Sequence, residues 1–66
     1  MNVYLDNQKT GLFLNPERGR TSSKTVLILW LGFRFIGVFT SVDEAKETIV
    51  NSLAEAGVTY TELLLK

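Results

Sequence analysis

The sequence contains no cysteine, no histidine and one proline in 66 residues. The absence of cysteine excludes disulfide bonds and thiolate chemistry, and the absence of histidine also removes the usual zinc sites. A chain of this size buries only about 60% of the surface that its unfolded form exposes. Small domains therefore commonly rely on a disulfide, a metal or self-association. The composition leaves a well-packed core or a partner as the source of stability, and no metal or cofactor is expected.

Long hydrophobic segments are also missing. The longest apolar run extends from Val26 to Phe39 and contains Arg34, whereas a membrane-spanning helix needs about 20 apolar residues. The opening stretch MNVYLDNQKT has neither the basic nor the apolar region of a signal peptide. We therefore expect no membrane segment and, since cysteine is absent, a cytoplasmic location.

Positive and negative charges are equal in number, but they are unevenly placed. Residues 1–34 have a basic excess, and residues 35–66 have an acidic one. Such a dipolar chain can orient an approaching partner.

The central apolar run is interpreted as a β-hairpin that turns at Gly32. A two-residue turn of the type that requires glycine first, Gly32–Phe33, pairs Leu31 with Arg34. The same register predicts four further pairs of like residues, which supports sheet pairing: Trp30–Phe35, Leu29–Ile36, Leu27–Val38 and Val26–Phe39.

A helix is predicted directly after the hairpin. Ser41 and Glu44 have the spacing of a capping box, in which each side chain bonds the other residue's amide. Gly57 stands where a left-handed C-terminal cap is expected. Between these signals one apolar stripe at helical spacing predicts a helix from Val42 to Ala56; it consists of Val42, Ala45, Ile49, Leu53 and Ala56.

The flanking segments are predicted to be strands and a loop. Residues 3–5 and 12–14 form two strands joined through residues 6–11, and residues 58–65 form the last strand. Asn15–Pro16 breaks the strand pattern, so residues 17–23 are expected to form a mobile polar loop. The prediction is a single α+β domain over residues 1–66. It has an antiparallel sheet of four to five strands, one helix on one face and the order ββ-ββ-α-β.

Both faces of the predicted hairpin are apolar, although one helix can cover only one of them. Side chains alternate along a strand, so one face carries Leu27, Leu29, Leu31, Ile36 and Val38, and the other carries Val26, Ile28, Trp30, Phe35, Gly37 and Phe39. Which face the helix covers remains open. The second face is covered either by the N-terminal segment, with Tyr4, Leu12 and Phe13, or by another chain. That chain is an identical copy or a target protein.

Catalytic and nucleotide-binding motifs are weak. The stretch from Gly19 to Thr25 has part of a phosphate-loop pattern, but it lacks the second glycine and precedes a strand. Asp43, Glu44 and Glu47 are explained by capping and by the helix dipole rather than by a metal. With no nucleophile–base pair to name, we expect no enzymatic activity.

A basic loop offers an alternative function, nucleic-acid binding. Arg18, Arg20 and Lys24 lie among small polar residues of the kind that contact phosphates. Arg34, which the aromatic Phe33 and Phe35 flank, is expected nearby. The chain nevertheless lacks the positive excess that is typical of such proteins.

Residues 35–45, FIGVFTSVDEA, resemble the strand-to-helix step IGVF-x-S-x-x-x-A of small phage and prophage proteins. The ending from Ala54 to Leu65, a helix, a glycine and a strand, is similar to that of small phage inhibitors of host enzymes, including inhibitors of bacterial RNA polymerase. The resemblance covers about half of the chain and carries no catalytic motif, so it implies no functional residue. It implies a phage or mobile-element protein in the cytoplasm of a bacterial host.

The leading hypothesis is therefore a non-enzymatic module that binds and modulates a host protein. Its predicted contact residues are Trp30, Phe33 and Arg34 on the hairpin, with Arg18 and Arg20 on the loop. Alternatives are nucleic-acid binding through the loop Arg18–Lys24 and a structural homodimer formed through an apolar sheet face.

Overall fold

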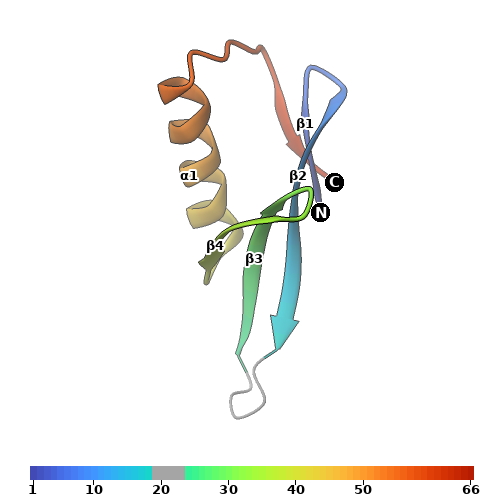
Figure 1. Cartoon of the computed structure of the whole chain (residues 1–66), viewed down its shortest axis with the longest axis vertical. Helices are drawn as coiled ribbons and strands as arrows, with labels where there is room; N and C mark the ends of the chain where they lie inside the picture. Colours follow the sequence, from blue (N-terminus) through green and yellow to red (C-terminus); the bar gives the residue numbers. More distant parts are fainter. Residues whose placement is uncertain (19–23) are drawn as a thin grey trace.

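A computed structural model describes residues 1–18 and 24–66 of the chain (Figure 1). Its elements are β1 (Asn2–Leu5), β2 (Gln8–Arg18), β3 (Thr25–Leu31), β4 (Arg34–Phe39), α1 (Val42–Glu55) and β5 (Leu63–Leu65). The strands form one antiparallel sheet in the order β4-β3-β2-β1-β5. Helix α1 lies against one side of this sheet. The predicted α+β fold with one helix on an antiparallel sheet is confirmed.

Strands β1 and β2 are joined more tightly than the sequence analysis predicted. Asp6 and Asn7 both have positive φ angles, 50° and 67°, as a two-residue hairpin turn requires. Asp and Asn tolerate this conformation better than other residues with side chains. Strand β2 consequently begins at Gln8, and the predicted connection as far as Gly11 is wrong.

Strand β2 also continues beyond the predicted break at Asn15–Pro16. Pro16 pairs with Leu27, and the strand ends at Arg18. On the side that faces β1, the backbone hydrogen bonds of β2 extend as far as Leu14, whose N–H donates to the Met1 carbonyl. Pro16 therefore lies where β2 has become a sheet edge, and a missing N–H is tolerated there. Of the predicted loop, residues 17–18 belong to β2, and residues 19–23 lie outside the described residues.

The β3–β4 hairpin turns at Gly32–Phe33 as predicted. Gly32 has a φ of 59°, and the pairs Leu31–Arg34 and Trp30–Phe35 are present. Beyond them a β-bulge shifts the register, so that Leu29 pairs with Gly37 rather than with Ile36. A bulge inserts one extra residue into one strand, and every later side chain of β4 changes its partner. The predicted pairs that follow Trp30–Phe35 are wrong for this reason.

Helix α1 begins with the predicted cap. The Ser41 hydroxyl accepts a hydrogen bond from the Glu44 amide at 3.2 Å. The Glu44 carboxylate accepts from the Thr40 hydroxyl at 2.9 Å, rather than from the Ser41 amide as predicted. The helix ends at Glu55, with Ala56 as its C-cap and Gly57 in the left-handed region at a φ of 73°.

The last strand is shorter than predicted. Only Leu63–Leu65 pair with β1, whereas the segment that begins at Val58 is not a strand. The Asp6 carboxylate accepts hydrogen bonds from the Thr61 and Glu62 amides at 2.8–3.2 Å. These bonds satisfy the backbone just before β5, so the prediction of a longer strand fails there.

The core lies between α1 and the facing side of the sheet. Its five buried residues are Val3, Leu14, Leu29, Ala45 and Ile49. They come from β1, β2, β3 and the helix. The predicted helical stripe supplies Ala45 and Ile49, and Leu53 packs against them half-buried. The helix therefore covers the hairpin face that carries Leu29.

Candidate protein-binding surface

The sheet face opposite α1 carries a row of aromatic side chains across three neighbouring strands. Phe13 on β2 pairs with Trp30 on β3, and Trp30 pairs with Phe35 on β4. The rings of Trp30 and Phe35 meet edge to face, with their centroids 5.8 Å apart and an interplanar angle of 78°. This geometry is favourable for aromatic pairs. The row is a continuous apolar strip that crosses β2, β3 and the edge strand β4.

Further apolar side chains extend this strip. Side chains alternate between the two faces along a strand. Tyr4, next to the core residue Val3, and Ile28, two positions from Trp30, therefore lie on the side of the aromatic row. We name this surface the open face and define it by seven residues: Tyr4, Phe13, Ile28, Trp30, Phe35, Val38 and Leu64. Phe35 and Val38 are 55% and 52% exposed. Its polar margin includes Lys66, whose ammonium lies 5.4 Å from the centroid of the Tyr4 ring.

The N-terminal segment does not fold over this face. Strand β2 pairs with β3 of the hairpin and β1 pairs with β2, so both extend the same sheet. The prediction that the N-terminal segment covers the second face of the hairpin is therefore wrong. The N-terminal residues pair as strands of the sheet, and their side chains Val3 and Leu14 lie in the core on the helix side.

The bulge in β4 decides which residues belong to the open face. After the extra residue, Val38 pairs with Ile28 on the open face, and Phe39 pairs with Leu27 on the helix side. Phe39 packs against the core. The predicted faces had these two residues exchanged, because they assumed an uninterrupted ladder.

Strand β4 is an edge of the sheet, with β3 as its neighbour on one side. Its side chains are exposed on both faces, since Phe35 and Val38 lie on the open face and Ile36 is 42% exposed on the helix side. Arg34 carries the only charge within this strand. Edge strands with long apolar stretches and few charges are prone to pair with another chain.

The structure divides the predicted contact residues into two groups. Trp30, Phe33 and Arg34 lie together at the β3–β4 turn, and Phe33 is fully exposed. Arg18 pairs with Thr25 at the opposite end of β3. At about 3.3 Å per residue, that strand separates the two ends by about 20 Å. The expectation that Arg34 lies near the basic loop is wrong, and Arg20 lies outside the described residues.

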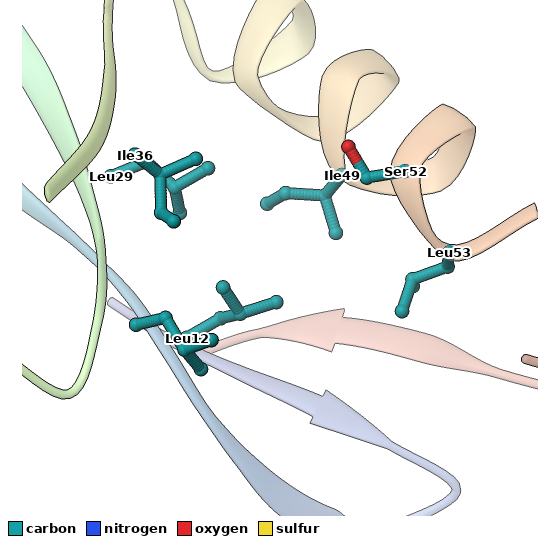
Figure 2. Close-up of a pocket in the computed structure, with 7 residues that line it drawn as sticks. Leu12, Leu29, Ile36, Ile49, Ser52 and Leu53 are labelled. Carbon is teal, nitrogen blue, oxygen red and sulfur yellow. The ribbon is translucent and has the colours of Figure 1, made fainter. Parts of the chain in front are cut away.

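A pocket opens between α1 and the sheet, close to the β3–β4 turn (Figure 2). Its volume is about 240 Å³. It is lined by Leu12, Leu29, Leu31, Ile36, Ile49, Ser52 and Leu53. In Figure 2 the Ile49 and Leu53 side chains reach from the helix toward Leu12 on β2, and a gap remains between the two layers. The Ser52 hydroxyl is the one polar side-chain group of the lining.

Residues 1–18 and 24–66 contain no cluster of three acidic side chains that could hold a metal ion. Within the same ranges, no helix is long and apolar enough to cross a membrane.

Comparison with protein-family models gives no match, and comparisons with curated proteins and with solved structures give none either.

Three features of the surface were missed in the sequence. The bulge at Ile36 has no signal besides Gly37, which pairs with Leu29 and whose added Cβ would meet the Phe39 ring at 3.3 Å. Glycine within a strand often marks a bulge. The role of Phe13 in the aromatic row depends on the β2–β3 register. The pocket depends on how the helix is placed over the sheet, and no local pattern encodes that placement.

Proposed function

We propose that the protein is a non-enzymatic binding module that modulates a host protein by occupying its surface. The observation that carries this proposal is the open face, which joins the exposed edge strand β4. Together they form one apolar surface that the described parts of the chain do not cover. Trp30 lies within it, between Phe13 and Phe35, and Arg34 lies at one end of β4.

The size of the apolar surface supports a protein partner. Soluble monomers rarely expose apolar patches larger than a few hundred Å², and the open face includes four aromatic residues in a chain of 66. Tryptophan and tyrosine are enriched among the residues that dominate binding energy. Lys66 and Lys9 at the margin, together with Asn15, supply the polar rim that is typical of an interface.

The edge strand suggests how the partner is held. In β-augmentation, an extended segment of a partner adds a strand to a sheet edge through main-chain hydrogen bonds. Such a segment beside β4 would have its side chains next to Phe35 and Val38. We infer that the partner contributes an extended segment with apolar side chains on the side of the open face.

The source of the protein follows from the resemblance of residues 35–45. Residues 35–39 form most of β4, and residues 42–45 are the first residues of α1. A strand that leads directly into a capped helix supports the resemblance to the small phage and prophage proteins. On this basis we propose that the protein is a phage or mobile-element product that acts in the cytoplasm of a bacterial host. Arg18 and Arg20 remain predicted contacts for a second region of the same partner.

Photo-crosslinking in bacterial lysates tests the proposal. A photoreactive amino acid at position 38 lies on the open face, and the same amino acid at Lys46 lies on the exposed side of α1. The expected result is a discrete crosslinked protein at position 38 that is absent at position 46. Competition by the unlabelled protein should remove this product, and the Trp30→Ser variant should compete poorly.

Equal crosslinking at both positions, or none at position 38 in lysates of several candidate hosts, would contradict host-protein binding. The variant Val50→Ser is a matched control for competition. It also removes an exposed apolar side chain, but from the helix.

The aromatic row favours one second candidate function, the binding of single-stranded nucleic acid. Bases stack on exposed aromatic side chains in a sequence-tolerant way, and Phe13, Trp30 and Phe35 form such a platform with Lys66 beside Tyr4. Binding of this kind weakens steeply with salt. Quenching of Trp30 fluorescence by an oligonucleotide, lost at high salt, would support it. Unchanged fluorescence at low salt would exclude it.

A further inference from the structure

The Phe33 side chain is fully exposed to solvent. Phe33 is the second residue of the β3–β4 turn, and its exposure equals that of a residue with no packing neighbours. The turn itself is well supported, because the Gly32 amide donates to the Gly11 carbonyl at 3.1 Å. An apolar ring on a fixed turn is suited to insertion into a cavity of another molecule.

A cavity of suitable size lies beside this turn. The pocket under α1 has a volume of about 240 Å³ and an almost entirely apolar lining. Apolar cavities of about 150 Å³ hold a benzene molecule, so this pocket has room for a phenyl ring with its methylene group. Ser52, the polar residue of the lining, is exposed.

The turn and the pocket share residues, which makes a reciprocal contact possible. Leu31 and Ile36 line the pocket, and they are also close neighbours of Phe33 on either side of the turn. In a two-fold symmetric dimer, one surface patch meets itself. A patch that carries both the projecting ring and the receiving pocket can therefore bind twice, with each copy inserting Phe33 into the other.

Charge complementarity also favours a second copy as the occupant. Arg34 follows Phe33 directly and would reach the rim of the receiving pocket. Helix α1 supplies Ile49, Ser52 and Leu53 to one wall of that pocket, and the helix as a whole carries Asp43, Glu44, Glu47 and Glu55 against the single Lys46. A basic residue beside the inserted ring would meet an acidic helix on the partner copy, and the same attraction would occur twice in the dimer.

We propose that two copies of this chain form a symmetric dimer in which Phe33 of each copy fills the apolar pocket of the other. The pocket is incomplete without the partner's ring, and the exposed Leu31 and Ile36 become buried around it. Specific interfaces bury at least about 500 Å² per partner, about a tenth of the 4895 Å² of accessible surface. The open face remains accessible, so this dimer is compatible with a host partner there.

Analytical ultracentrifugation of the full chain tests the dimer with two variants. Phe33→Ala removes the ring, which has no contact to lose within its own copy. Ser52→Trp covers the pocket from the exposed helix surface. We expect a dimer for the wild type and a dimer dissociation constant raised at least about 100-fold in Phe33→Ala, since two buried rings are lost per dimer. Ser52→Trp should be monomeric in the same range, and Arg34→Glu should weaken the dimer as well.

A mixture of the two variants provides the decisive measurement. Phe33→Ala retains a free pocket, and Ser52→Trp retains its ring, so a mixture should form one-sided heterodimers that neither variant forms alone. Val38→Ala is the control, because it removes an exposed apolar side chain from the open face and should leave the dimer unchanged. Circular dichroism establishes that each variant is folded.

Three results would overturn the proposal: a strictly monomeric wild type, a Phe33→Ala dimer as stable as that of the wild type, or no heterodimer in the mixture. A dimer that Val38→Ala disrupts and Phe33→Ala does not would place the second copy on the open face instead. If the wild type is strictly monomeric but still crosslinks a host protein at position 38, the dimer is overturned and the proposed function stays intact.

Discussion

The two faces of the sheet differ far less in composition than in what covers them. Leu14 and Leu29 lie under α1 and are almost fully buried, whereas Phe35 and Val38 on the open face are more than half exposed. Both sets are apolar. The comparison shows that the apolar character of these strands exceeds what one helix can cover, and the surplus lies on the open face and along β4.

The largest expected effect concerns the covered face. Leu29→Ala should destabilise the protein by about 2–5 kcal/mol, because it leaves a cavity in a core of five buried residues. Chains of this length have a total stability of about 3–10 kcal/mol, so urea unfolding should show a much lower midpoint or no folded state. Leu31→Ala, on the same strand but 43% exposed, is the control and should cost clearly less.

Phe35→Ala tests the open face and should cost about 1 kcal/mol. Its ring is more than half exposed, and its main partner is Trp30, in an edge-to-face pair of the kind worth about 0.5–1.5 kcal/mol. Trp30 fluorescence during urea unfolding measures the stability. The fluorescence of the folded state also reports the loss of the neighbouring Phe35 ring. A cost equal to that of Leu29→Ala would mean that the open face is as tightly packed as the core, and the contrast between the faces would fail.

Ser41→Ala tests the attachment of the covering layer. The Ser41 hydroxyl accepts from the Glu44 amide, and loss of such a cap typically costs about 1 kcal/mol. Thermal unfolding followed at 222 nm measures the change. Ser41→Asp retains an acceptor at the cap and should restore most of the lost stability. If it does not, the cap is not what stabilises the start of the helix.

The smallest effect on stability is expected at the turn. Phe33→Ala should change the free energy of unfolding by less than about 0.5 kcal/mol, as is usual for exposed positions without special contacts. The free energy of unfolding should be measured at a concentration where the wild type is monomeric. A larger loss would show that the ring packs within its own chain, in contrast to its full exposure.

Much of the fold could be predicted because the relevant signals are local. The glycine turn at Gly32, the cap at Ser41 and the stop at Gly57 each depend on residues within a few positions of one another. The helix of 14 residues begins at the predicted residue and ends one residue early. The candidate site was predicted less well, because it depends on the register and on which strands become neighbours.

Particular residues show why these errors arose. The Asp6 carboxylate bonds the backbone of residues 61 and 62, 55 and 56 positions away in sequence. The hydrophobic periodicity of the sequence gives no sign of such a contact. Arg34 and Arg18 were expected to be near each other, but the fully paired β3 keeps them at opposite ends.

The sequence by itself determined the kinds of element, their order and the apolar excess of the central hairpin. Backbone sterics, capping and side-chain alternation act over a few residues, so they can be read along the chain. Only the tertiary structure decided which face α1 covers, where the β4 bulge exchanges Val38 and Phe39, and that a pocket lies beside Phe33. Each of these depends on packing between segments far apart in sequence, and the open face with its edge strand is the result.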